Sequence, residues 1–336
     1  MRARFAWKRT LLAAAIFSGA VVGVSRSYES HLIEPLTITG AHKGRTVMVT
    51  ATRRSAGAIE SLQWGGVEFL DSNDHGRDLQ SAVSFDGLTE CDNPTEAGSS
   101  WDGNRPQSTS SRLHKAVVAN NMIRTSSHMA YWLRRGHRSG ACKKALNAGD
   151  PSPVSSTRLT KRVRFLPGYD NVLEHRITFD LARPRSQAQF EVLTAYMPRM
   201  FGTFYRVDPA SGDQAALSDG PGEQELPVVL ATEDGTHALG LFTPQTGQPG
   251  LTGPGYGRWR FSDARVTKSN VVFRQKDAVA GPHRFLVYTV FGTLEDVRAT
   301  LVRLHNERGM TLVELTGRVL PQEDVGAPVV ALESAH

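Results

Sequence analysis

The chain is patterned mainly as short runs in which apolar and polar residues alternate or β-branched residues cluster, separated by Gly, Asn, Asp and Pro. Such runs are typical of β-strands. Residues 46–50 alternate strictly, and residues 58–64 are joined to 67–70 by Gly65-Gly66, a dipeptide that tolerates the positive φ of a hairpin turn. Further strands are predicted over 114–119, 122–127, 159–165, 171–181, 190–196, 228–232, 238–243, 270–274 and 284–289.

One late segment follows the helical period instead. Thr293 is suited to an N-cap and Asp296 stands at the capping-box position, after which apolar residues recur at helical spacing, at Val297, Leu301 and Leu304. Two long loops are expected, over about 86–112 and 134–157. No internal repeat and no linker with a composition shift divides the chain. The pattern therefore predicts an all-β fold, a large antiparallel β-sandwich with one late α-helix.

The N-terminus is patterned as an export signal. Residues 11–24 are almost wholly apolar and follow a basic segment that contains Arg2, Arg4, Lys8 and Arg9. The run is shorter than the roughly 20 apolar residues that a membrane-spanning helix needs. We therefore expect a signal peptide over 1–27, a single domain over 28–336, no stable membrane insertion after cleavage, and a periplasmic or secreted protein. An uncleaved N-terminal anchor is the alternative.

A signal peptide over 1–27 also changes how the net charge of +6 is interpreted. Much of the excess belongs to residues 1–27, which hold Arg26 besides the four cations above and no acidic residue. A nucleic-acid partner is therefore not expected, and neither is an oligomer. The basic residues within 134–144 lie in a Gly/Ser/Pro-rich stretch, which we interpret as a solvated loop, with contact to an anionic glycan as the alternative.

Cys91 and Cys142 are the two cysteines of the chain. An even number in an exported protein permits one disulfide, which we expect between these two residues, and two buried thiols are the alternative. Neither cysteine shows the spacing of a metal site.

Candidate chemistry concentrates in the polar stretch 73–98, directly after the first hairpin. Polar groups on a loop that a rigid sheet carries are typical of a binding site, although a solvated loop has the same composition. Carboxylates, amides and guanidinium groups suit sugar hydroxyls, and aromatic rings suit the apolar faces of a sugar. The expected ligand is thus a carbohydrate, bound by Asp74, Arg77, Gln80, Trp101, Trp132, Tyr256 and Trp259.

Three residues are candidates for catalysis: His75, Glu90 and Glu96. His75 titrates near neutral pH and suits a general acid or base. A glycosidase would need two carboxylates, for which Glu90 with Glu96 or Asp86 are available, and a lyase would need a base beside a cation such as Arg77. Metal and nucleotide motifs are absent from the sequence, so no metal and no cofactor is expected.

Residues 59–70, followed by the polar turn of residues 74–77, resemble the first hairpin of the galactose mutarotase-like super-sandwich family. Aldose 1-epimerases, domains of polysaccharide lyases and parts of glycoside hydrolases share that architecture. The resemblance implies a substrate-binding role for Arg77 and a carbohydrate-processing protein of the epimerase, lyase or glycosidase type. A non-catalytic glycan-binding protein and a structural envelope protein remain the alternatives.

Overall fold

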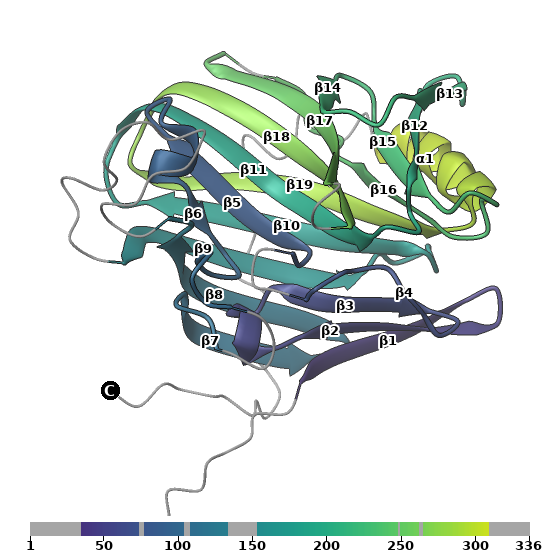
Figure 1. Cartoon of the computed structure of the whole chain (residues 1–336), viewed down its shortest axis with the longest axis horizontal. Coiled ribbons are helices and arrows are strands. Elements are labelled where there is room, and N and C mark those ends of the chain that lie inside the picture. The colour runs from purple at the N-terminus through teal and green to yellow at the C-terminus, as the bar shows by residue number, and fades with distance from the viewer. Residues whose placement is uncertain are drawn as a thin grey trace, which may run out of the picture. The chain divides into compact units, whose positions relative to one another are not determined.

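The computed structural model describes residues 35–73, 77–103, 108–133, 153–247, 249–261 and 265–308. Nearly all regular structure within them is β-strand (Figure 1). The first sheet contains β1 (Leu36–His42), β2 (Arg45–Ala51), β3 (Ile59–Trp64) and β4 (Val67–Glu68), in that order. The predicted Gly65-Gly66 turn is confirmed, because both residues have positive φ, 60° and 86°, and they connect the antiparallel pair β3–β4.

The second sheet is larger and also antiparallel throughout its described pairs. Its strands are β5 (Gln80–Phe85), β6 (Pro94–Thr95), β7 (Arg112–Ala119), β8 (Met122–Tyr131), β9 (Val154–Phe165), β10 (Val172–Leu181), β11 (Arg185–Pro198), β12 (Thr203–Val207), β13 (Gln214–Leu217), β14 (Gly222–Gln224), β15 (Val228–Ala231), β16 (Ala238–Phe242), β17 (Leu251–Phe261), β18 (Val266–Ala278) and β19 (Gly281–Gly292). Their order is β13-β12-β15-β16-β19-β10-β9-β8-β6-β5-β11-β18-β17-β14, with β7 paired to β8.

Packed aromatic rings show how this sheet encloses a core. Phe179 of β10 and Phe285 of β19 both contact Phe190 of β11, with ring centroids 5.2 and 5.1 Å apart. The β10–β19 part of the sheet thus faces the β11–β18 part, and Phe273 of β18 joins the same cluster. The all-β sandwich predicted from the sequence is confirmed.

The late helix is confirmed as α1 (Leu294–Arg308). Its capping box forms as predicted, since the Asp296 amide donates to Thr293 Oγ1 and the Thr293 amide donates to Asp296 Oδ2, each at 3.1 Å. Val297, Leu301 and Leu304 are buried against a second apolar cluster that includes Tyr288. Two short 3-10 helices, Arg53–Ser55 and Thr89–Asp92, complete the described elements, none of which is a helix long and apolar enough to span a membrane.

The predicted loop ranges include residues that belong to regular elements. The stretch 86–112 contains a 3-10 helix and β6, and β9 begins at Val154. The alternation of apolar and polar residues also does not predict β1, β5, β12, β13, β14 or β17. All six residues of β5 are buried, including the polar residues Gln80, Ser81 and Ser84. The strand therefore lacks the alternation of buried apolar and exposed polar residues by which a strand is predicted.

Candidate functional site

Polar side chains line up across β5, β11, β18 and β17. Gln80 is the register partner of Thr194, Thr194 of Asn270, and Asn270 of Gly257. Register partners on antiparallel strands point to the same face of a sheet. This row therefore lies on one face, opposite to the face that carries the core residues of β11 and β18, such as Phe190 and Phe273.

A β-bulge in β11 adds a carboxylate to this row. The register shifts between Glu191 and Leu193, so that Val192 is the extra residue and both Val192 and Leu193 are buried in the core. In a regular strand, residues three apart point to opposite faces. The bulge instead brings Glu191 and Thr194 to the same face, where the Thr194 hydroxyl donates to Glu191 Oε2 at 3.3 Å.

Glu191 receives all its hydrogen bonds on one oxygen. Lys268 Nζ and Asn270 Nδ2 each donate to Oε2 at 3.1 Å, in addition to Thr194. The other oxygen, Oε1, accepts no hydrogen bond from any residue that the structure describes. The Glu191 and Lys268 side chains are 16% and 13% exposed, so solvent still reaches the pair.

Both members of this pair are held in their charged forms. Burial by itself would raise the pKa of Glu191, but the charge of Lys268 and the hydrogen bonds from Lys268, Asn270 and Thr194 outweigh it, and the pKa lies below its ordinary value. Burial likewise opposes the charge of Lys268, but Glu191 and Tyr196 raise the pKa of that ammonium group. Glu191 is therefore an ionised acceptor at neutral pH.

Aromatic rings border the pair. The Lys268 ammonium lies 4.6 Å from the ring centroid of Trp259 and 5.4 Å from that of Tyr196. The Trp259 ring extends over Gly257, because a Cβ atom placed on Gly257 would lie 2.3 Å from the indole. Gly257 is thus required for this ring position, and its amide donates to Asn270 Oδ1 at 3.2 Å. Gln80, Glu191, Thr194, Tyr196, Trp259, Lys268 and Asn270 are together called the Glu191 cluster below.

A second ion pair continues the polar band along the same face. Arg274 is the register partner of Gln189 and donates from Nε to Gln189 Oε1 at 2.9 Å. Its two terminal nitrogens donate to the two carboxylate oxygens of Glu223, at 2.7 and 2.8 Å. Both oxygens of Glu223 are therefore engaged, unlike those of Glu191.

Of the residues predicted from the sequence, Gln80 and Trp259 belong to this face, and Arg77 lies beside it. Arg77 Nη1 is 3.7 Å from Asp71 Oδ2, and the Asp71 amide donates to the carbonyl of Tyr196 at 3.0 Å. The Gln80 side chain is buried, and its Oε1 accepts from the Ala97 amide. Asp74 and His75 lie outside the described residues.

Glu96 and Tyr256 lie in the interior. Glu96 Oε2 is 2.7 Å from Lys161 Nζ and accepts from the Ser81 amide at 2.9 Å, whereas Glu96 Oε1 has no partner in the part of the chain described. Burial raises the pKa of Glu96, and Lys161 offsets this only in part. Tyr256 is buried in the core, and its hydroxyl accepts from the Thr243 amide at 3.2 Å. Neither side chain is on the face of the Glu191 cluster.

The remaining predicted residues gather around the 3-10 helix Thr89–Asp92 and the end of β8. The Trp132 carbonyl accepts from the Ser100 amide at 2.9 Å, which places the loop of the exposed Trp101 against it. Trp132 itself packs on Cys91 and Leu133, and Glu90 lies within the 3-10 helix. Cys142 lies outside the described residues, so the disulfide stays a prediction.

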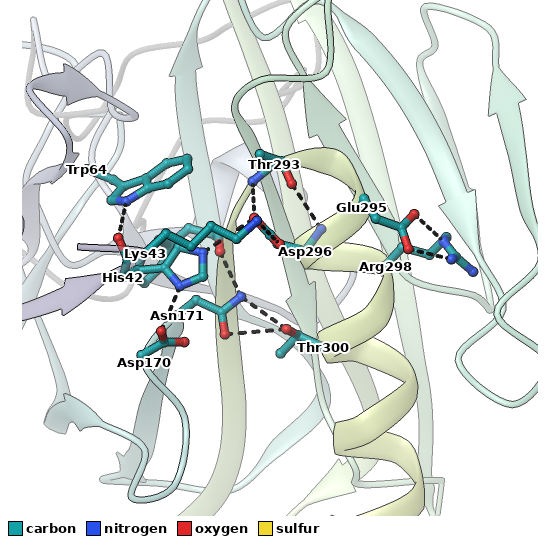
Figure 2. A network of polar contacts seen from close by, with 11 residues as sticks. His42, Lys43, Trp64, Asp170, Asn171, Thr293, Glu295, Asp296, Arg298 and Thr300 are labelled. Atoms are coloured by element: carbon teal, nitrogen blue, oxygen red, sulfur yellow. Dashed lines mark hydrogen bonds and ion pairs between the residues drawn. The ribbon is translucent and has the colours of Figure 1, made fainter. Parts of the chain in front are cut away.

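Figure 2 shows a different polar network, at the start of α1. His42 Nδ1 lies 3.0 Å from Asp170 Oδ2 and His42 Nε2 lies 3.4 Å from Asp296 Oδ2, while Lys43 Nζ lies 2.6 Å from Asp296 Oδ1. Because Asp296 also caps the helix, this network has a structural explanation: it joins the β1–β2 turn to α1. No group of three or more potential metal ligands occurs among the residues described.

No protein-family model matches the chain, and no curated protein resembles it in sequence. Among solved structures, heparan sulfate lyase HepC from Pedobacter heparinus matches with a TM-score of 0.39 and 9% identity, over 77% of this chain and 35% of that one. A "putative aldose 1-epimerase" from Klebsiella pneumoniae gives 0.39 and 11%, over 79% and 84%. Slr1438 protein from Synechocystis gives 0.40 and 9%, over 77% and 96%.

A putative aldose 1-epimerase and a heparan sulfate lyase are thus among the similar structures, which fits the weak resemblance stated from the first hairpin. The chain spans about a third of the length of HepC. Scores this low describe a distant likeness and assign no activity, so function has to be argued from the side chains of this chain.

Proposed function

We propose that the face formed by β5, β11, β18 and β17 binds a saccharide through the Glu191 cluster. One observation carries the proposal: a mostly buried but solvent-accessible, ionised carboxylate with one unused oxygen lies in the same group as an indole ring positioned over a glycine. A saccharide needs both features, because its hydroxyls require fixed acceptors and its C–H faces require an apolar surface.

Different residues of the cluster would contact different parts of the saccharide. Glu191 Oε1 would accept from a sugar hydroxyl, and the hydrogen bonds already on Oε2 fix the carboxylate before the ligand arrives. Trp259 would contact the ring carbons. A carboxylate that is already oriented loses little conformational entropy on binding, which favours affinity.

The geometry favours recognition over hydrolysis. The pKa of Glu191 is lowered, so the group holds no proton to donate at neutral pH. Glu223, the carboxylate of the second ion pair on this face, uses both oxygens for Arg274. The proposal is therefore a carbohydrate-binding protein, and catalysis by His75, Glu90 or Glu96 stays a prediction from the sequence.

Export belongs to the same proposal. The apolar run 11–24 with its basic flank supports a signal peptide, and a periplasmic or secreted protein would meet environmental or envelope glycans. Mass spectrometry of protein recovered from the cell envelope would detect a new N-terminus near residue 28. Recovery of the intact Met1 terminus would contradict export by cleavage.

Binding can be tested on a glycan array, followed by calorimetry with the best neutral oligosaccharide. We expect Glu191→Gln to weaken binding by about tenfold or more, as the loss of a charge-assisted hydrogen bond of about 1.5–3 kcal/mol requires. Trp259→Ala should weaken it by a similar factor, because it removes the apolar surface for the ring carbons. Glu225→Gln and Trp101→Ala are matched controls, because both residues are exposed and lie outside the cluster. Equal losses in a control and its partner variant, or no glycan bound by the wild type, would refute the site.

A further inference from the structure

Cationic side chains gather on the solvent face of β7, β8, β9 and β10. Residues at every second position of β9 are exposed or half-buried, and Arg158, Thr160, Arg162 and Arg164 are among them. Their register partners share this face. The face carries Arg112, Lys115, Arg124, Arg158, Arg162, Arg164 and Arg176, with Arg284 of β19 at its border.

The carboxylates of these strands do not neutralise the face. Glu174 is buried and is shared between Arg164 and Arg176, each at 3.0 Å, and Asp180 pairs with Arg158 at 3.2 Å. Among the described residues, Arg124 and Arg162 form no ion pair. Both guanidinium groups are exposed and available to an anion.

The three central arginines lie directly opposite one another. Arg124 is the register partner of Arg162, and Arg162 of Arg176, so like charges occupy neighbouring strands about 4.8 Å apart. Like charges directly opposite in a sheet are destabilising. The positive potential also acts on its neighbours: partial burial, together with the charges of Arg112 and Arg158, lowers the pKa of His114 and His128.

We infer that this face, which we call the arginine face, binds an anionic polysaccharide. Guanidinium groups pair with carboxylate or sulfate in a bidentate way, and a row of them across strands suits an extended, repeating polyanion. Ser126, Thr160 and Thr178 form the row between the arginines and offer hydroxyls to the sugar units. None of these residues belongs to the Glu191 cluster, so the inference stands independently of the proposed function.

The composition of the face favours a glycan over other polyanions. Single-stranded nucleic acids are usually held on aromatic platforms, and among the described residues of this face the ring of Tyr288 is buried beside α1. Reading a duplex needs an element narrow enough to enter a groove, such as a helix or a two-stranded ribbon, which the face of a sheet of several strands does not supply. A membrane surface would need exposed apolar anchors beside the charges, whereas Leu286, the register partner of Arg176, is buried in an apolar cluster.

The test is the binding of the full mature chain to four probes at several salt concentrations: heparin, polygalacturonate, dextran and an oligo-dT strand. We expect binding to heparin, polygalacturonate or both, which separates sulfate from carboxylate recognition, and no binding to dextran at this face. The variant Arg124→Ser/Arg162→Ser should weaken binding by about tenfold or more and flatten the slope of log K against log salt by about 2. Relief of like-charge repulsion should leave Tm unchanged or raise it by about a degree.

Arg199→Ser/Arg206→Ser is the matched control, because it removes the same charge from exposed positions on other elements. Its affinity for the anionic probe should stay within about twofold of wild type. Equal losses in both double variants, tighter binding of oligo-dT than of either polysaccharide, or no binding of an anionic probe at low salt would overturn the inference. Glu191→Gln should keep its affinity for the anionic probe, which distinguishes failure of this inference from failure of the Glu191 cluster.

Discussion

Two Glu–Lys pairs of this protein bridge neighbouring elements with similar geometry and opposite electrostatics. Glu96 and Lys161 are 2.7 Å apart in the interior, and Glu191 and Lys268 are 3.1 Å apart on a sheet face where their side chains are 16% and 13% exposed. Each glutamate accepts its hydrogen bonds on Oε2. Yet the pKa of Glu96 is raised and that of Glu191 is lowered.

The difference lies in what surrounds the lysine–carboxylate contact. Glu96 is fully buried with one donor besides Lys161, whereas Glu191 has two further side-chain donors and retains contact with solvent. Distance alone therefore does not decide the charge state of a pair; desolvation and the number of donors do. The interior pair is interpreted as structural, and the pair that solvent still reaches is the one suited to a ligand.

The largest expected effect comes from breaking the interior pair. Lys161→Met would leave Glu96 buried without its cation, and removal of one partner of a buried pair costs about 3–5 kcal/mol of unfolding free energy. Urea denaturation at neutral pH would measure this loss.

Its control is the double variant Lys161→Met/Glu96→Gln, which removes the isolated charge and should recover part of the stability. A Lys161→Met protein as stable as the wild type would show that Glu96 is not held in the interior as an ion.

A smaller effect is expected at the Glu191–Lys268 pair, which solvent still reaches. Lys268→Met leaves Glu191 with Asn270, Thr194 and solvent, so the unfolding free energy should fall by only about 1–3 kcal/mol. The same denaturation experiment measures it, and saccharide binding should suffer more than stability. A loss of stability larger than that of Lys161→Met would reverse the comparison.

The smallest expected effect is the pH dependence of the unfolding free energy, which should have opposite directions for the two glutamates. Because the folded pKa of Glu191 lies below its ordinary value of 4.5, its contribution to stability is fully present above that pH and is lost as pH falls through the lowered value. Glu96 has a raised folded pKa, so its contribution is present below 4.5 and is lost as pH rises through the raised value.

Unfolding free energies of Glu191→Gln and Glu96→Gln, each subtracted from wild type between pH 3 and 7, would separate these trends. The difference should grow with pH for Glu191→Gln and shrink with pH for Glu96→Gln. Parallel curves would mean that the two environments are electrostatically alike.

Much of the fold could be predicted from sequence because many of its strands alternate apolar and polar residues. This pattern is local, so it can be recognised in each strand by itself. The β9 run alternates buried and exposed residues along most of its length, and the capping box of α1 is a local signal. β17 was missed for the opposite reason: Gly253, Gly255 and Gly257 within one strand indicate turns, although they make room there for neighbouring groups.

The site was harder to predict because its contacts are set by register. Lys268 and Asn270 meet Glu191 across 77 and 79 residues of sequence, and no spacing rule links them. The available signal was Glu191 itself, a carboxylate between the apolar residues Phe190 and Val192. The polar stretch 73–98 was read as a loop, which concealed that Gln80 starts a buried strand and that Glu96 lies in the interior.

The bulge at Val192 decides which side chains of β11 point to the face of the Glu191 cluster. Glu191 and Thr194 are an odd number of residues apart, and one extra residue in β11 is what lets them share a face. Deleting Val192 would restore regular pairing with β18 and leave Glu191 and Thr194 two residues apart, so both would stay on this face. Straightening the strand with Val192 kept would instead turn either Glu191 or Thr194 toward the core. A protein engineer who idealised the sheet in that second way would break up the Glu191 cluster without replacing any of its members.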